Sequence, residues 1–228
     1  MRVLTRYLRH RLILVLVLCV SAGCNSMFVL HHDKYHNVPY INPEGHYWTY
    51  KPSLTDSSVA INIDNITCYY LGSFPINKTD LPDDYTYGTI ISSYAFKWTQ
   101  GDTCILIEDN RGLYKYDPHY DTIERIISRD LRKGNSWYYT ADTEAIIKNT
   151  YEKVINGDVY CCVEVGISGL VGGDTYVWAM GLGLLSFTDT IFVDPHMNLM
   201  PIFCVDNNTR IIEVTYSLVE WGEDERKL

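Results

Sequence analysis

The sequence predicts an all-β chain whose single domain is a strongly curved antiparallel sheet, a half-barrel or open barrel built of hairpins. Short segments rich in β-branched and aromatic residues recur along the chain, with turn signals between them. Asn156-Gly157 separates two of these segments and is the strongest two-residue hairpin signal. Residues 121–131 fit either a short helix or a strand, and we favour a strand because the neighbouring segments are hairpins. We therefore expect little helix outside the first 23 residues.

In the first half of the domain, the strands follow one another as a meander. The expected strands are residues 47–50, 59–63, 68–71, 89–98, 103–108 and 113–116. Residues 74–87 form a loop that contains two prolines and three aspartates. These aspartates lack the spaced oxygen ligands of a calcium loop, so a solvated turn is the better interpretation.

The second half continues the meander with longer strands. The expected strands are residues 136–139, 145–155, 159–167, 176–180, 184–187, 202–205 and 211–219. Gly181 and Gly183 allow a sharp bend or a close approach of two backbones, which a curved sheet requires. A dinucleotide-binding loop is excluded, because Ser186 stands where a third glycine is needed and no helical pattern follows.

The first 23 residues have the composition of a secretory signal peptide. Four arginines and no acidic residue stand among the first eleven positions, and an apolar run covers residues 12–20. This run is too short to span a bilayer, which needs about 20 apolar residues. A basic start, a short apolar run and small residues before the cleavage point are typical of a segment that is removed on export.

Residues 20–24, Val-Ser-Ala-Gly-Cys, resemble the lipobox of bacterial lipoproteins. The resemblance implies that Cys24 receives diacylglycerol and fatty acyl chains such as palmitate, becomes the first mature residue and anchors the protein to a membrane without spanning it. Asn25 follows instead of aspartate, and no acidic run comes after it. The favoured location is therefore the outer membrane with the domain facing the periplasm, and surface display stays open. The expected organisation is a signal peptide at 1–23, a lipidated cysteine and flexible tether at 24–45, a β domain at 46–222 and a frayed tail at 223–228.

Charge and histidine content limit the partners of the exported chain. Its 15 basic residues would stand against 28 acidic ones, which gives a net charge of about −13. Phosphate recognition needs clustered Lys and Arg, so nucleic acid is excluded, and no polybasic patch is present for anionic lipids. His31, His32 and His36 could bind a transition metal, but no further ligand completes a preformed site. We therefore expect no metal and no cofactor.

Five cysteines would remain in the domain: Cys68, Cys104, Cys161, Cys162 and Cys204. The number is odd, so at least one thiol stays free or pairs between chains. Their spacing matches no zinc or redox motif, and the disulfide pattern is left open. The adjacent pair of cysteines lies in an expected strand, so its two side chains should point to opposite faces.

Two segments of the carboxyl half resemble motifs of uncharacterised envelope lipoproteins. Residues 154–163 (V-I-N-G-D-V-Y-C-C-V) are similar to a hairpin V-x-A-G-x-F-x-C-x-x-V, and residues 176–184 (Y-V-W-A-M-G-L-G-L) to a strand Y-x-W-Y-A-x-G-V-G-L-V. Asn156 replaces the alanine of the first pattern, and Ala179 replaces a tyrosine of the second. The resemblance implies a curved half-barrel similar to lipoprotein carriers of the periplasm, and it brings no catalytic residue. The residues of structural importance are Asn156, Gly157, Trp178, Gly181 and Gly183.

The favoured function is a non-enzymatic, lipid-anchored envelope lipoprotein that either shelters an apolar ligand or interacts with another envelope protein. A glycan-binding or glycan-degrading protein is the alternative, since 19 tyrosines and five tryptophans could stack on sugars. No pair of carboxylates is nominated for glycoside hydrolysis. A hydrolase is disfavoured because the chain lacks G-x-S-x-G. A dyad of Cys161 or Cys162 with His119 or His196 would be needed instead, and both histidines lie in turns.

Overall fold

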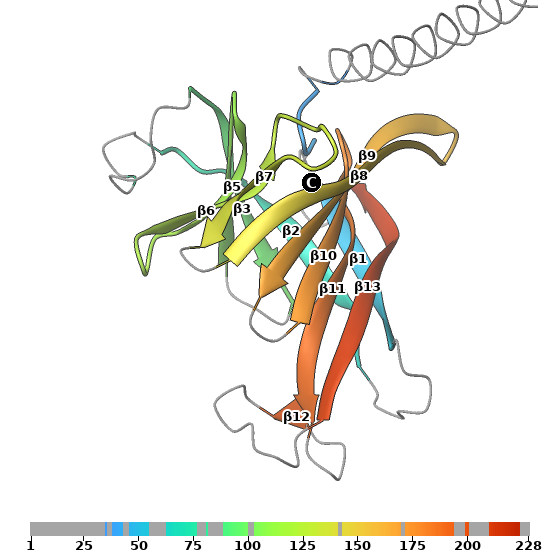
Figure 1. Ribbon diagram of the computed structural model, residues 1–228. Coiled ribbons are helices and arrows are strands. Elements are labelled where there is room, and N and C mark those ends of the chain that lie inside the picture. Colours follow the sequence, from blue (N-terminus) through green and yellow to red (C-terminus); the bar gives the residue numbers. More distant parts are fainter. Residues whose placement is uncertain are drawn as a thin grey trace, which may run out of the picture. The chain divides into compact units, whose positions relative to one another are not determined.

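The computed structural model of the chain describes residues 35, 38–42, 46–54, 63–76, 81, 89–99, 103–140, 143–169, 172–193, 199–200 and 210–223. The chain forms two compact units, Met1–Asn37 and Val38–Leu228, and the described strands all lie in the second (Figure 1). The predicted signal peptide and Cys24 fall outside the described residues. Within the described ranges, no helix has the length and apolar character needed to cross a membrane.

The described strands form one antiparallel sheet, which confirms the predicted fold class. Their order across the sheet is β6-β5-β4-β3-β2-β1-β13-β11-β10-β9-β8-β7, and β12 pairs with β11 beside this path. The strands are β1 (His46–Leu54), β2 (Ile66–Ser73), β3 (Ile90–Trp98), β4 (Thr103–Asp109), β5 (Gly112–Asp117), β6 (Thr122–Ser128), β7 (Ser136–Thr140), β8 (Thr143–Ile155), β9 (Asp158–Gly169), β10 (Gly172–Ala179), β11 (Gly183–Val193), β12 (Leu199–Met200) and β13 (Arg210–Glu223). Residues 121–131, which the sequence left between helix and strand, contain strand β6.

One predicted strand, residues 202–205, lies wholly outside the described residues. Of the predicted strand 59–63, only Ile63 is described, and it does not belong to a strand. At the carboxyl end, β13 continues to Glu223, which pairs with His46 of β1. The sheet therefore extends one residue beyond the predicted end of the domain.

The sheet curls into a nearly closed barrel, whose seam lies between β6 and β7 (Figure 1). These two strands end the sheet order and are successive in the chain. Side chains bridge the seam: the Trp137 indole donates a hydrogen bond of 2.7 Å to the carbonyl oxygen of Arg125. In the connecting segment, Asn135 Nδ2 donates to Asp130 O at 2.8 Å and to Ser128 Oγ at 3.2 Å. Closure removes the exposed edges that an open sheet would present.

The predicted turns have the backbone conformation that their sequences favour. Asn156 and Gly157 have φ angles of 52° and 94°, the positive pair that a type I′ hairpin turn requires, and they join β8 to β9. Gly181 and Gly183, with φ angles of 88° and 110°, lie at the turn between β10 and β11. A Cβ at Gly183 would lie 3.7 Å from the indole of Trp48, which is an ordinary contact, so the positive φ angle and not crowding favours glycine here.

Residues 38–42, which we name the strap, pack against the sheet of their own unit, although the sequence placed them in a flexible tether. The side chains of Tyr40 and Ile41 are 0% and 5% exposed. The Tyr40 amide donates a hydrogen bond of 3.2 Å to Glu108 Oε1, and the Tyr40 carbonyl accepts one of 3.2 Å from the amide of Gly181. These bonds satisfy the backbone of a buried segment that has no ladder partner. The strap could not be predicted from the sequence, because so short a segment shows no periodicity.

Apolar side chains also gather on the face of β4 and β5 that points away from the cavity described below. The segment that follows β2 contributes to this cluster, so part of the predicted loop 74–87 covers the sheet. The cluster consists of Leu81, Ile105, Ile107, Tyr114 and Tyr116, with Phe74, Ile76, Ile90 and Ile123 packed against it. Both faces of β4 are therefore buried from Ile105 to Asp109.

The two adjacent cysteines of β9 are both buried, at 1% and 0% exposure for Cys161 and Cys162. Cys162 pairs with Ala179 and packs against Leu182 and Leu185, whereas its neighbour belongs to the other face of the strand. The predicted opposition of the two side chains is confirmed, and β9 is covered on both faces at this point.

A candidate binding cavity inside the barrel

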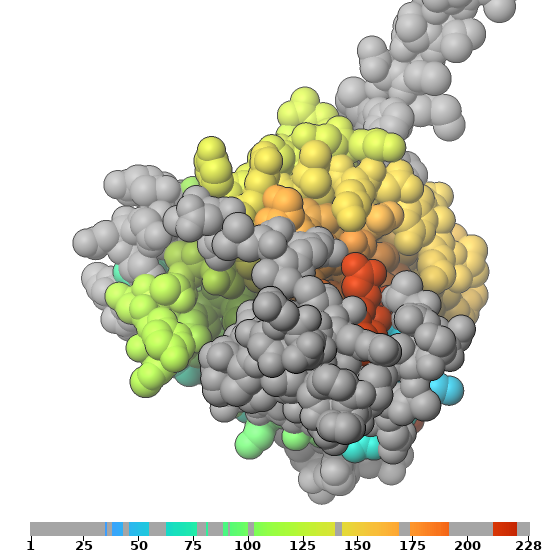
Figure 2. All heavy atoms as spheres, turned by 60° about the horizontal axis from the view of Figure 1, so that its bottom comes forward, coloured from blue at the N-terminus to red at the C-terminus, as the bar shows by residue number. Residues whose placement is uncertain are grey.

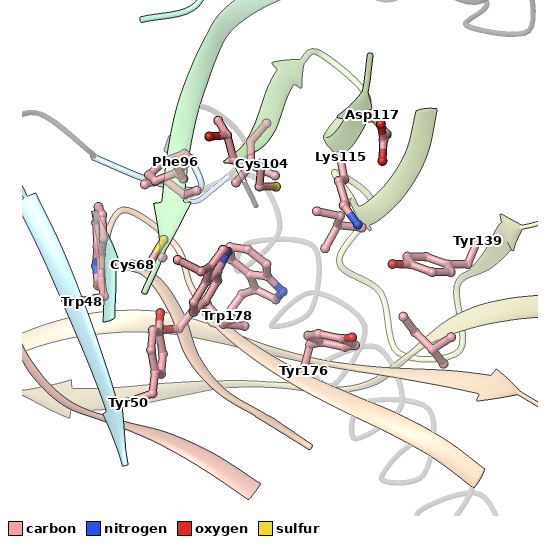
Figure 3. A pocket seen from close by; sticks show the side chains of 18 residues that line it. Trp48, Tyr50, Cys68, Phe96, Cys104, Lys115, Asp117, Tyr139, Tyr176 and Trp178 are labelled. Atoms are coloured by element: carbon pink, nitrogen blue, oxygen red, sulfur yellow. The ribbon is translucent and has the colours of Figure 1, made fainter. Parts of the chain in front are cut away.

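The barrel encloses a cavity of about 410 Å³, which lies in the size range of small-molecule sites (Figure 3). Its walls come from ten strands, and Ile41 of the strap contributes one more side chain. Most of the lining is aromatic or aliphatic. The aromatic lining residues are Trp48, Tyr50, Phe96, Trp98, Tyr139, Tyr176 and Trp178.

Three of the lining rings, Tyr50, Trp98 and Tyr176, belong to one connected cluster with Phe187 and Tyr216 of neighbouring strands. Tyr50 lies 5.7 Å from both Trp98 and Phe187, measured between ring centroids. Phe187 stacks on Tyr216 at 4.9 Å and on Tyr176 at 6.3 Å. Such offset and edge contacts stabilise ring pairs beyond the area that they bury. The cluster therefore holds one side of the cavity in a fixed shape.

The polar atoms of the aromatic wall divide into satisfied and unsatisfied groups. The Trp48 indole donates a hydrogen bond of 3.0 Å to Leu182 O, and the Tyr50 hydroxyl donates one of 2.9 Å to Leu184 O. The indole nitrogen of Trp178 is buried as well, but it has no hydrogen-bond acceptor among the described residues. An unpaired buried donor is unfavourable, so this atom is an exception within the cavity wall.

Charged side chains mark the other side of the cavity. Figure 3 shows Lys115, Asp117 and Tyr139 on one side of the view, with Trp48 and Tyr50 on the other. Lys115 is exposed, so the cavity reaches solvent near its side chain. Burial, followed by nearby carboxylates, raises the pKa of Tyr139 well above its usual value, and this hydroxyl therefore stays protonated at neutral pH. The cavity is thus amphipathic, with an aromatic part and a polar part.

Two cysteines with free thiols line the cavity: Cys68 is buried, and Cys104 is half-buried. They lie on β2 and β4, with β3 between them, so their backbones are about 10 Å apart, which is too far for a disulfide. Burial raises the pKa of Cys104 to about 11 and that of Cys68 further. Both thiols are therefore protonated and weakly nucleophilic at neutral pH.

A labelling experiment checks this assignment. In a variant with Cys104 as its only cysteine, alkylation by iodoacetamide at pH 8 should be at least roughly a hundredfold slower than at an ordinary exposed thiol, because the thiolate fraction is lower. The rate should rise about tenfold per pH unit until pH 11. A variant with one cysteine placed at exposed Lys133 is the matched control. A rate for Cys104 that levels off near pH 9 would contradict the raised pKa.

A buried ion pair holds the strap at the barrel. Arg129 NH2 lies against Glu108 Oε1, and the two side chains are 8% and 1% exposed. Arg129 NH1 donates a hydrogen bond of 2.6 Å to the carbonyl oxygen of Val38, and its guanidinium lies 4.4 Å from the ring centroid of Tyr40. Burial raises the pKa of Glu108, and the Arg129 charge opposes this shift. The pair therefore fixes the strap, which places Ile41 at the cavity.

The structure separates the residues that the sequence singled out. Trp178 lines the cavity, and Gly181 contacts the strap, whereas Asn156 and Gly157 form a hairpin tip outside the cavity lining. The thiols of the proposed dyad, Cys161 and Cys162, are buried in β9, and burial raises the pKa of the latter. His119 lies in the exposed turn after β5 with its ring on Tyr120, and His196 is outside the described residues.

Several residues of the cavity were not singled out by sequence reasoning. Lys115 and Trp98 lie in predicted strands, and their alternation with neighbours indicates which residues share a face, but not which face becomes the interior. Glu108 and Arg129 carry no motif at all. Within the described ranges, no group of three or more His, Cys, Asp or Glu side chains is placed to hold a metal ion.

Comparison of the chain with protein-family models, with curated proteins and with solved structures finds no match. The interpretation of the site therefore depends on its own geometry.

Proposed function

We propose that this chain is a non-enzymatic, lipid-anchored lipoprotein of the cell envelope, and that its barrel shelters an apolar ligand. The observation that carries the proposal is the aromatic cavity of about 410 Å³ inside a nearly closed sheet. An interaction role for the outer surface would not require such a cavity, so the structure favours ligand shelter over a purely structural function.

The free energy of an empty cavity supports this proposal. Protein interiors are close-packed and contain few voids larger than a water molecule. Apolar wall area that faces water costs roughly 25 cal/mol per Å² relative to buried area. Several large rings surround this cavity without filling it, although they contact one another. An apolar occupant would remove that cost, and this favours a ligand over permanent hydration.

The membrane anchor in this proposal comes from the lipobox resemblance at Cys24. Residues 25–37 connect it to the strap, and a chain of this length spans at most about 45 Å when extended. The domain would therefore stay close to the membrane surface, where apolar molecules are concentrated. The outer membrane, with the domain on its periplasmic side, remains the favoured location.

Extraction of the purified protein tests whether an apolar ligand is bound in the barrel. The experiment uses a Cys24→Ser background, so that acyl chains of the anchor do not enter the extract. We expect organic extraction and mass spectrometry to find an apolar compound at about one molecule per chain. Cys104→Trp should reduce its amount several-fold, because the new indole fills a cavity of the size of a small ligand.

Lys97→Trp is the matched control, since Lys97 is exposed on β3 and does not line the cavity. Each variant must first show a cooperative unfolding transition. An extract without any such compound, or with equal amounts from Cys104→Trp and the control, would refute ligand shelter. Hits on a glycan array in place of apolar compounds would favour the glycan-binding alternative.

A further inference from the structure

We infer that the sheltered ligand is an acidic amphiphile, with an apolar chain among the aromatic side chains and a carboxylate or phosphate head that faces the donors Lys115 and Trp178. The inference rests on the proposed function and adds the chemical class of the ligand. Its basis is a buried indole N–H without an acceptor among the described residues, in a cavity that a lysine ammonium also lines.

The first donor is the indole N–H of Trp178. This side chain is 5% exposed and lines the cavity, and its nitrogen has no acceptor among the described residues. The indole of Trp48, by contrast, is satisfied by the carbonyl of Leu182. A buried N–H is normally paired, so an acceptor on the ligand would complete the site.

The second donor is the ammonium group of Lys115. No hydrogen bond or ion pair joins it to any residue that the structure describes. Figure 3 shows its nitrogen directed into the cavity, while Trp178 lies in the middle of the view. Hydrogen bonds between an ammonium and a carboxylate or phosphate are about twice as strong as neutral ones. A head group between the aromatic part and the solvent-exposed side would meet this ammonium.

Carboxylates near the lysine weaken this attraction without removing it. Asp117 lines the cavity, but its Oδ1 accepts hydrogen bonds from the amides of His119 at 2.9 Å and Tyr120 at 3.3 Å. Glu124 stands opposite Lys115 in the ladder between β5 and β6 and lies beside Tyr139. Both acids thus have other donors close by, whereas the lysine has no partner among the residues that the structure describes. The Tyr139 hydroxyl is hydrogen-bonded to Glu124, so it occupies part of that carboxylate.

The rival ligand is a cationic amphiphile, since aromatic rings together with a carboxylate also attract quaternary ammonium groups. Four compounds with the same twelve-carbon chain distinguish the classes: dodecanoate, dodecyl phosphate, dodecanol and dodecyltrimethylammonium. Binding to the Cys24→Ser protein is followed by tryptophan fluorescence at concentrations where each compound is monomeric. Trp48, Trp98 and Trp178 line the cavity and supply the signal.

We expect an acidic head to bind about tenfold more tightly than dodecanol, with the trimethylammonium compound weakest. The ratio of the dissociation constants of dodecanoate and dodecyl phosphate then shows which acidic head group fits better. Lys115→Met should raise the dissociation constants of the two acidic compounds about tenfold and change that of dodecanol by no more than about twofold. Trp178→Phe should weaken the acidic compounds while keeping the shape of the wall. Lys97→Met is the control, because this lysine is exposed and outside the cavity.

The possible outcomes separate this inference from the proposed function. If none of the four compounds binds, apolar shelter fails as well. If all four bind equally, or if Lys115→Met leaves acid binding unchanged, shelter stands and the acidic head is overturned. Tightest binding of the trimethylammonium compound would overturn it in favour of a cation.

Discussion

Replacement of Arg129 by methionine is expected to lower the free energy of unfolding by about 3 to 5 kcal/mol. Arg129 is the charge partner of buried Glu108 and also holds the Val38 carbonyl. Methionine would leave the carboxylate uncompensated in a site where burial already raises its pKa. The strap would lose its main attachment, and the cavity would lose a fixed wall at Ile41. Urea denaturation followed by tryptophan fluorescence measures the change.

Arg132→Met is the matched control for this prediction. Arg132 lies three positions from Arg129 and pairs with Asp130, and the two side chains of this pair are 74% and 30% exposed. Solvent screens exposed pairs of this kind, so they contribute little to stability. If both substitutions lowered the free energy of unfolding equally, the claim that Arg129 stabilises the fold as a buried charge partner would be contradicted. The double variant Glu108→Gln/Arg129→Met should recover much of the loss, since no unpaired charge remains.

The pH dependence of the Arg129→Met variant follows from the raised pKa of Glu108. Below the unfolded pKa of about 4.3, the carboxyl group is protonated in both states, and the penalty for burying its charge is absent. As the pH rises, the unfolded state ionises first, and stability is lost until the pH exceeds the folded-state pKa. The variant should therefore differ less from the wild type at pH 4 than at pH 7. A larger difference at pH 4 would show that the loss has another origin.

The local elements could be predicted from the sequence because their determinants are local. Asn156 and Gly157 adopt the positive φ angles that only a few residue types tolerate, and the flanking strands follow from β-branched and aromatic segments. Strand β6 was favoured over a helix only from its neighbours, and its pairing with β5 shows why that reasoning worked. A segment inside a meander is stabilised as a strand by the ladder beside it.

The closure of the barrel and its cavity could not be predicted, since they depend on contacts between distant positions. Register shifts, such as the one between Ile147 and Asn149 in β8, change how a strand pairs and bends. No residue pattern predicts where they occur. Both faces of β4 are buried, so alternation alone does not tell which of Ile105 and Leu106 faces the interior. The strap was missed because Tyr40 is buried by Glu108 and Arg129, far away in the sequence.

The strap links the buried ion pair to the cavity. Arg129 holds the carbonyl oxygen of Val38 by a hydrogen bond. The next residues contact Glu108 and the turn at Gly181, and Ile41 lines the cavity. The ion pair of Arg129 and Glu108 therefore holds Ile41 at the cavity wall. The Arg129→Met variant should for this reason lose ligand faster than the Arg132→Met control.

Replacement of Cys24 by serine should move nearly all of the protein from the membrane fraction to the soluble fraction. Each buried methylene contributes roughly 0.8 kcal/mol to membrane binding, so several acyl chains hold a protein firmly, whereas one chain holds it only marginally. Serine cannot carry the thioether-linked lipid that the lipobox resemblance implies. Cell fractionation and metabolic labelling with palmitate measure the outcome, and labelling should fall to background.

Cys19→Ser is the matched control, because Cys19 lies in the apolar run of the expected signal peptide and leaves the chain on cleavage. This variant should keep both the membrane location and the palmitate label. A Cys24→Ser protein that still sediments with membranes, or wild type without label, would disprove the anchor. The ligand proposal would survive that result, since the cavity is formed by β strands and the strap, all downstream of the anchor. The two proposals therefore stand on separate residues and can fail separately.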